Sequence, residues 1–306
     1  MSASHLKERV RLVWRDMKKY KHAYVLLAPY FIIFLTFTAF PVLMSVALSF
    51  TNFNMLQSPE WVGWSNYAKL FVNDDIFLIS LKNTLLFAAI TGPISYMACF
   101  LFAWLVNELP PKIRAIMTLI LYAPSISGNT YLIWQLIFSG DSYGFANSFL
   151  MNWGFSLEPI QWLQDTKYML VILMIVQLWL SLGTAFLAFI AGLQNVDPTL
   201  YEAGAIDGVR NRWQELWFIT LPAMRPQLLF GAVIQIASSF AVAEISMNLV
   251  GFPSVDYAAN TIVTHLIDYG TIRFEMGYSS AIATVLFAIM LLTNLITQRL
   301  LRKVGE

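Results

Sequence analysis

The sequence predicts an all-α polytopic membrane protein with six transmembrane helices, and three observations lead to this fold class. Of the 306 residues, 58% are hydrophobic and only 12% are charged, whereas soluble domains carry about 25% charged residues. The apolar residues gather in long runs, each able to cross a hydrocarbon core about 30 Å thick as a helix of roughly 20 residues. Lys and Arg are distributed unequally between alternate connections, as expected of a multi-pass protein.

Six apolar runs follow one another along the chain. The expected spans cover about 24–50, 76–106, 115–138, 168–193, 228–250 and 279–301. Basic residues precede the first run, as in a signal peptide, but the run is longer than a signal core and no small-residue cleavage site follows, so we expect a retained helix. We expect Pro29 and Pro41 to bend this helix without ending it, because neighbouring helices can satisfy the backbone groups that proline frees.

The basic residues place both termini on the cytoplasmic side. Of the 19 Lys and Arg residues, only Lys69, Lys82, Lys167 and Arg273 fall on the expected outer side. The others lie in the segments expected inside, which are 1–23, about 107–115, 194–227 and 299–306. We expect 1–23 to be a basic tail held at anionic lipid, 24–301 to form the transmembrane domain, and 302–306 to be a cytoplasmic C-terminus.

Composition and motifs argue against several functions. A net charge of +1 provides no field that would attract nucleic acid. The single cysteine, Cys99, excludes an internal disulfide and a multi-cysteine metal site. The chain has no GxxxxGK[ST] run, so we expect no nucleotide site in it, and we expect no catalytic residue and no metal site. We expect His265, which shares the outer segment 251–278 with Asp268, to lie at the surface.

The longest inner connection, 194–227, carries helix signals. Asp197 before Pro198 is typical of a helix N-terminus, although Thr199 and Glu202 form an alternative capping box. Gly208 suits the C-terminal end of this first helix. A second helix is expected from Asn211 to about Thr220, where Leu221-Pro222 would stop or kink it. The apolar face of the pair would either lie on the bilayer or dock into a soluble partner, and the residues alone leave both open.

Several stretches resemble one family of transport proteins. Glu-Ala-Gly at 202–204, Gly208 and Ile-Thr-Leu-Pro at 219–222 resemble the EAA signature of permease subunits in bacterial ATP-binding-cassette (ABC) importers. The stretches AGLQNVDPTLYEAGAIDG, YAPS, WLSLG and MGYSSAIATVLF resemble the carbohydrate-uptake, maltose-type branch. Two departures are visible: Gly204 replaces the usual Ala, and one residue more than expected separates Gly208 from Ile219.

The resemblance implies a type I importer permease in the bacterial cytoplasmic membrane. The first helix of 194–227 would lie in a cleft of an ATPase subunit, with Glu202 meeting a basic residue there. The implied partners are a second, non-identical permease subunit, two ATPase subunits that bind ATP and Mg, and an extracytoplasmic solute-binding protein. The residues expected to couple this chain to the ATPase are Glu202, Ala203, Gly204, Asp207, Gly208, Leu221 and Pro222.

Polar residues inside the spans indicate where a solute would be held, because such residues usually face a cavity. At 1.5 Å per residue, Asn129 and Gln177 lie roughly 14 Å below the outer surface and Glu244 lies about 9 Å below it. Amides and hydroxyls at one depth suit a neutral polyol such as a sugar, and Trp179 would cover an apolar sugar face. The layer comprises Ser125, Asn129, Gln177, Trp179, Ser181, Ser238 and Glu244.

The resemblance adds Tyr122 and Thr184, which occupy places comparable to substrate positions in maltose-type permeases. It also points to Ala241, which cannot donate a side-chain hydrogen bond, so the pocket is not a copy of the maltose one.

Other interpretations stay open at this point. The small polar residues and aromatics of the layer would also serve helix packing, and Glu244 would also serve gating or subunit pairing. The same architecture would carry glycerol phosphate, a polyamine or an anion. Spans three to five contain no basic residue, which counts against an anion. A membrane-embedded enzyme would need clustered intramembrane catalytic groups, and Glu244 stands alone.

Overall fold

The computed structural model describes residues 19–302 with the exception of Asn129. The basic residues of 1–18, the pathway candidate Asn129 and the segment 303–306 therefore lie outside the described residues. Within them, four helical stretches are long and apolar enough to cross a membrane, and the number reaches six if each of two bent helix pairs is one span. The four are Lys21–Leu48, Asp75–Asn107, Met169–Gln194 and Met276–Leu301.

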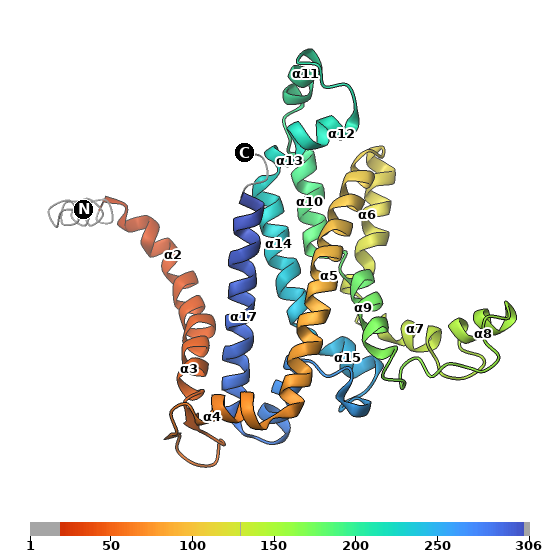
Figure 1. Ribbon diagram of the computed structural model, residues 1–306. Coiled ribbons are helices and arrows are strands. Elements are labelled where there is room, and N and C mark those ends of the chain that lie inside the picture. Colours follow the sequence, from red (N-terminus) through yellow and green to blue (C-terminus); the bar gives the residue numbers. More distant parts are fainter. Residues whose placement is uncertain (1–18, 129, 303–306) are drawn as a thin grey trace.

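The first helical stretch stands apart from the others and approaches them through its C-terminal half. It consists of α2 (Lys21–Phe34), the π-helical turn η1 (Leu35–Ala39) and α3 (Phe40–Leu48). The stretch continues through Pro29 and Pro41, and α3 packs against α17 (Met276–Arg302). Figure 1 shows α2 diverging from the bundle, and most of its apolar side chains are exposed.

The bundle has α5 (Asp75–Asn107), α10 (Thr184–Gln194) and α14 (Arg225–Phe240) at its centre, each packed against the other two. The buried side chains of Phe186, Phe189 and Met224 fill the space between these helices towards one end. Towards the other end, α5 and α17 enclose Phe77 and Ile282. These contacts hold the helices that carry the candidate site.

The third expected span is bent. It consists of α6 (Pro111–Ile126) and α7 (Thr130–Ile137), which meet at 85°. Pro124 lies in the last turn of α6, where it leaves the preceding backbone without a normal helical hydrogen bond. As a result α7 runs sideways from the bundle towards α8 (Phe145–Asn152), as Figure 1 shows.

The fifth expected span, 228–250, is not one helix. Helix α14 ends at Phe240, residues 241–243 are not helical, and α15 covers Glu244–Leu249. The hydroxyl of Thr261 donates a hydrogen bond to the carbonyl oxygen of Val242, which supplies a partner for a backbone group that the break exposes. The stabilising group comes from a later loop, so the apolar run alone could not show the break. The fourth span is interrupted in a similar way between α9 (Met169–Leu180) and α10.

The two ends of the bundle carry different structures. At one end lie α11 (Pro198–Ile206), α12 (Arg212–Glu215), the π-helical η3 (Leu216–Thr220) and α13 (Leu221–Ala223). The opposite end carries short elements in the expected outer loops (Figure 1). These are β1 (Thr51–Asn52), paired antiparallel with β2 (Glu60–Trp61), α4 (Ser65–Ala68), η2 (Lys69–Asn73), α8, η4 (Val255–Tyr257), α16 (Ile262–Ile267) and η5 (Asp268–Ile272). Helix α15 lies at the same end, although it belongs to the fifth expected span.

Candidate substrate cavity and coupling segment

A cavity of about 700 Å³ lies at the break between α14 and α15. It brings together side chains from α6, α9 and α14 that are far apart in sequence. Four of the nine predicted pathway residues line it: Ser125, Gln177, Ser238 and Glu244. Ala241, which the resemblance singled out, lines it as well.

The polar groups of this cavity differ in whether they already form hydrogen bonds within the protein. The Gln177 side chain is 7% exposed and makes no hydrogen bond to another described residue, so its amide is available to a solute. Ser125 Oγ donates to the Tyr122 carbonyl at 2.8 Å, and Ser238 Oγ donates to the Gln235 carbonyl at 3.2 Å. Each of these hydroxyls keeps its lone pairs for a further donor.

Glu244 is the one charged side chain among the described residues that line the cavity. It begins α15, directly after the break, and its side chain is exposed. Tyr131, which the sequence analysis did not select, lines the cavity and its phenol interacts with the Glu244 carboxylate. A carboxylate beside amide and hydroxyl groups can accept hydrogen bonds from a polyol and repels an anion.

The other predicted pathway residues lie elsewhere. Tyr122 lines a second cavity with Arg114 and Gln194, nearer the α11 end. Trp179 stacks edge-on against Trp134 with ring centroids 5.4 Å apart. Ser181 Oγ donates to the Leu178 carbonyl at 2.6 Å, and Thr184 is exposed at the start of α10. Trp179, Ser181 and Thr184 are not among the residues that line the 700 Å³ cavity.

The outer segment contributes to the cavity in a way that was not expected. Val263 and Ile267 of α16 form part of its wall. No signal for this was visible in the sequence, because α16 is a short apolar helix inside a loop. It reaches the cavity through its packing against α5, α17 and the α14–α15 break.

The expectation that His265 lies at the surface is wrong. Its side chain is 2% exposed, and its Nε2 atom lies 2.9 Å from Oδ2 of Asp74. Asp74 itself is 7% exposed and caps α5 by accepting a hydrogen bond from the Phe77 amide. Asp268, in contrast, pairs with Arg273 at 2.7 Å. The imidazole is buried because α16 folds back against α5, a contact between distant segments that the local sequence did not indicate.

The first helix of the 194–227 segment, α11, forms as the sequence indicates. The Asp197 carboxylate accepts a hydrogen bond from the Thr199 amide at 2.9 Å, which lowers its pKa, so Asp197 and not Thr199 caps the helix. Gly208 ends the helix with a φ of +94°, a conformation that favours glycine. Glu202, Ala203 and Asp207 are exposed on α11, and Ile206 is 88% exposed.

Gly204 has a structural explanation. It is the buried residue of α11, and a Cβ atom placed on it would lie 2.5 Å from Cδ1 of Ile219. The absence of a side chain therefore lets α11 and η3 pack closely, which accounts for glycine where the EAA signature usually has alanine.

The second part of the segment returns to the bundle. Arg212 pairs with Glu215 at 2.7 Å and with Glu108, which follows α5, at 3.1 Å. Trp213 packs against Trp104 of α5 with ring centroids 5.3 Å apart. Leu221 and Pro222 lie within α13, and the chain turns by 80° at Met224 instead of at the Leu-Pro pair. These contacts tie α11 and its loop to the end of α5.

The chain matches known transport proteins over most of its length. A profile described as "Binding-protein-dependent transport system inner membrane component" matches residues 83–306. The probable ABC transporter permease protein YesP of Bacillus subtilis is 32% identical over 89% of this chain and 88% of that protein. The arabinooligosaccharides transport system permease protein AraP of the same species is 32% identical over 94% of this chain and 91% of that protein.

A further relative and a solved structure agree with these matches. The lactose transport system permease protein LacF of Rhizobium radiobacter is 29% identical over 92% of this chain and 94% of that protein. A crystal structure of a bacterial ABC transporter that imports the acidic polysaccharide alginate has a chain with the same fold, at a TM-score of 0.76. The identity there is 24%, with 96% of this chain and 99% of that chain covered.

These matches, together with the helical bundle and the segment at 194–227, confirm that this is a multi-pass membrane permease of the ABC importer type and not an enzyme. The chain belongs to the family of inner membrane components of binding-protein-dependent transport systems.

Proposed function

We propose that this chain is the permease subunit through which an ABC importer moves a neutral sugar or oligosaccharide across the bacterial cytoplasmic membrane. The observation that carries the proposal is the cavity of about 700 Å³ at the break in span five. Its lining offers the Gln177 amide, the hydroxyls of Ser125 and Ser238 and the Glu244 carboxylate, and these groups can bind sugar hydroxyls. A helix broken at a polar cavity is the arrangement in which irregular backbone is tolerated inside a membrane.

One observation favours a sugar over other solutes, and a second favours a neutral sugar. Relatives of this chain are named for arabinooligosaccharides and for lactose. Other similar proteins are named for acidic glycans, so family membership does not decide the charge of the solute. The cavity favours the neutral class, because its described lining contains Glu244 and no Lys, Arg or His. A uronate or phosphate in this cavity would meet a carboxylate without a compensating cation.

The chain supplies half of the proposed transport pathway. A second, non-identical permease subunit would complete the pathway, and an extracytoplasmic binding protein would deliver the sugar. Two ATPase subunits, which bind ATP and Mg, would dock on α11 through Glu202, Ala203 and the surface around Asp207. This arrangement requires α11 and both termini to be cytoplasmic. ATP binding and hydrolysis in the partners would then expose the cavity alternately to the two sides.

The test is ATP-driven accumulation in proteoliposomes that contain the complete importer and its binding protein. The solutes compared are a neutral arabino- or galacto-oligosaccharide, an alginate oligosaccharide, glycerol 3-phosphate and spermidine. The proposal predicts accumulation of a neutral glycan and none with an ATPase variant that cannot hydrolyse ATP. Accumulation of the alginate oligosaccharide, the phosphate ester or the polyamine in its place would overturn the proposed cargo.

A further inference from the structure

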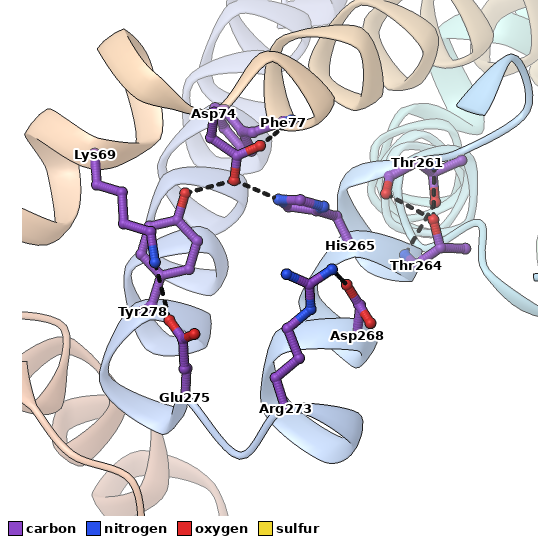
Figure 2. Close-up of polar contacts among 10 residues, drawn as sticks. All are labelled: Lys69, Asp74, Phe77, Thr261, Thr264, His265, Asp268, Arg273, Glu275 and Tyr278. Carbon is purple, nitrogen blue, oxygen red and sulfur yellow. Dashed lines mark hydrogen bonds and ion pairs between the residues drawn. The ribbon is translucent and has the colours of Figure 1, made fainter. Parts of the chain in front are cut away.

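Three elements meet at a buried polar cluster near the outer end of the bundle. Asp74 precedes α5, His265 lies on α16 and Tyr278 lies in the first turn of α17. Figure 2 shows the imidazole and the phenol pointing at the same carboxylate. His265 Nε2 is 2.9 Å from Asp74 Oδ2, and the Tyr278 hydroxyl donates to the same oxygen at 2.6 Å. All three side chains are less than a tenth exposed.

The carboxylate of Asp74 is the acceptor for every bond in this cluster. Burial alone would raise the pKa of Asp74, but hydrogen bonds from His265, Tyr278 and the Phe77 amide outweigh burial and lower it to about 2. Asp74 is therefore ionised at physiological pH and can only accept. It follows that Nε2 of His265 carries a hydrogen and that the Tyr278 hydroxyl is a donor. Bonds to an ionised acceptor are stronger than neutral ones.

The same helix, α16, presents its other side to the cavity. Val263 and Ile267 line the cavity, and each is two positions from His265. Two positions correspond to a rotation of about 200° around a helix. His265 therefore lies on the side of α16 opposite to Val263 and Ile267, and the cluster contacts α16 on the side that faces away from the cavity. At its N-terminus α16 is also bound to α5, because the Ile262 amide donates to Thr84 Oγ1 at 2.9 Å.

We infer that Asp74, His265 and Tyr278 form a buried tie that positions α16 as the outer wall of the solute cavity. They are positioning residues, since none of them lines the cavity. The inference rests on the proposed function, which makes this cavity the pathway. Because α16 also supports the break in span five through Thr261, the tie fixes α5, α17 and the cavity wall relative to one another.

Nearby exposed pairs do not have this role and provide a control. Lys69 pairs with Glu275 at 2.9 Å, and these side chains are 43% and 44% exposed. Neither residue belongs to α16, as Figure 2 shows. Exposed pairs contribute little because solvent screens them. Glu275→Gln therefore removes a charge from the same region without loosening the tie.

The experiment measures the accessibility of α16 in the complete importer in lipid nanodiscs. Cys99→Ser removes the single cysteine of the chain, and Ile267→Cys places a thiol on the cavity side of α16. The rate of labelling by a hydrophilic maleimide is then compared with and without Asp74→Asn. We expect labelling to accelerate about tenfold or more when the buried acceptor loses its charge, and to change less than about twofold with Glu275→Gln.

If the Asp74→Asn complex fails to assemble, Tyr278→Phe tests whether the cluster positions α16. This variant removes one hydroxyl and leaves the ring, so it disturbs the packing less. Its expected acceleration is about threefold or more, as one buried hydrogen bond is lost. Unchanged labelling in every variant that assembles, or an equal acceleration in Glu275→Gln, would overturn the tie. Protection of Ile267→Cys by the transported sugar is measured separately. If the sugar does not protect Ile267→Cys from labelling but Asp74→Asn still accelerates labelling, the cavity is not the pathway, and the tie between Asp74, His265 and Tyr278 is still supported.

Discussion

Nε2 of His265 lies 2.9 Å from the carboxylate of Asp74, and the two residues are separated by 191 positions in the sequence. The contact joins the start of α5 to the middle of α16 and so links the central bundle to the outer wall of the candidate cavity. It also leads us to predict that this end of the bundle is sensitive to acid.

The first prediction concerns this sensitivity. The pKa of Asp74 is lowered from 3.8 to about 2 in the folded chain. A depressed pKa stabilises the fold above the unfolded value, and the contribution is lost as pH falls from about 5 to about 2. The purified complex should melt at a higher temperature than the Asp74→Asn complex at pH 7, and the difference should shrink between about pH 5 and pH 3.

Other charged and titratable groups face this cluster and must be accounted for in that experiment. Lys69 lies over the Tyr278 and Tyr269 rings, and Arg273 lies over Tyr269. These cations pair with the exposed Glu275 and Asp268. Glu275→Gln serves as the control and should leave the pH dependence in place. A melting difference between wild type and Asp74→Asn that stays constant from pH 7 to pH 3 would contradict the assignment.

The second prediction concerns coupling to the ATPase. Gly208 has a φ of +94° with nothing within 4 Å, so Gly208→Val strains the turn that ends α11 without an overlap. Gly208→Val and Glu202→Lys should leave the subunit in the membrane and abolish sugar-stimulated ATP hydrolysis. Gly154→Val is the matched control, because Gly154 has a φ of +73° and equally open surroundings in the 139–167 segment. Normal stimulated hydrolysis in both α11 variants would show that the ATPase docks elsewhere.

The third prediction tests the packing of Gly204. A Cβ atom on this residue would lie 2.5 Å from Cδ1 of Ile219, and overpacking of this kind typically costs about 1–3 kcal/mol. Gly204→Ala should therefore lower the melting temperature of the complex. Ile219→Val removes the conflicting atom, and in that background Gly204→Ala should be neutral or stabilising, because alanine is favoured in helices by roughly 1 kcal/mol. Equal effects of Gly204→Ala in both backgrounds would rule out the contact as the reason for glycine.

The fourth prediction concerns orientation. In a Cys99→Ser background, cysteines replacing Trp64 or Phe155 should react with an impermeant maleimide added to spheroplasts, because both side chains are exposed and lie in segments expected to be outside. A cysteine replacing Ile206 should react only after the membrane is broken, although this side chain is also exposed. Labelling at position 206 in intact spheroplasts would reverse the orientation and exclude α11 as the coupling helix.

The helical spans and α11 could be predicted from the sequence because the residues that indicate them are close together in the chain. Long apolar runs predict spans wherever helices are continuous, and Asp197, Glu202 and Gly208 mark a helix and its end within a dozen residues. The observed α5 and α17 begin and end within a few residues of the expected spans. Four of the predicted pathway residues line one cavity, and their common depth could be predicted because depth along a helix follows from the rise per residue.

The helix break, the buried His265 and the exact lining of the cavity depend on contacts between segments that are distant in the sequence. The break after Phe240 is stabilised by Thr261, and His265 is buried by Asp74, so neither could be found from the local pattern. Trp179 and Thr184 have suitable chemistry and depth, but neither lines the cavity with Gln177. Thr184 lies beyond the break between α9 and α10, and Trp179 is two positions after Gln177 on α9, a rotation of about 200° around the helix. Depth along an ideal helix does not fix the direction of a side chain once the helix is interrupted.

The central claim is that the cavity beside the α14–α15 break is the sugar pathway, and uptake by three variants tests it most directly. The measurement is ATP-driven sugar uptake at saturating binding protein, with assembly checked by co-purification of the ATPase. Gln177→Ala should slow uptake several-fold and Glu244→Ala more strongly, since neutral and charged hydrogen bonds differ by roughly a factor of two in strength. Thr184→Ala, outside the cavity lining, should transport at the wild-type rate. Wild-type uptake by assembled Gln177→Ala and Glu244→Ala complexes would contradict the account.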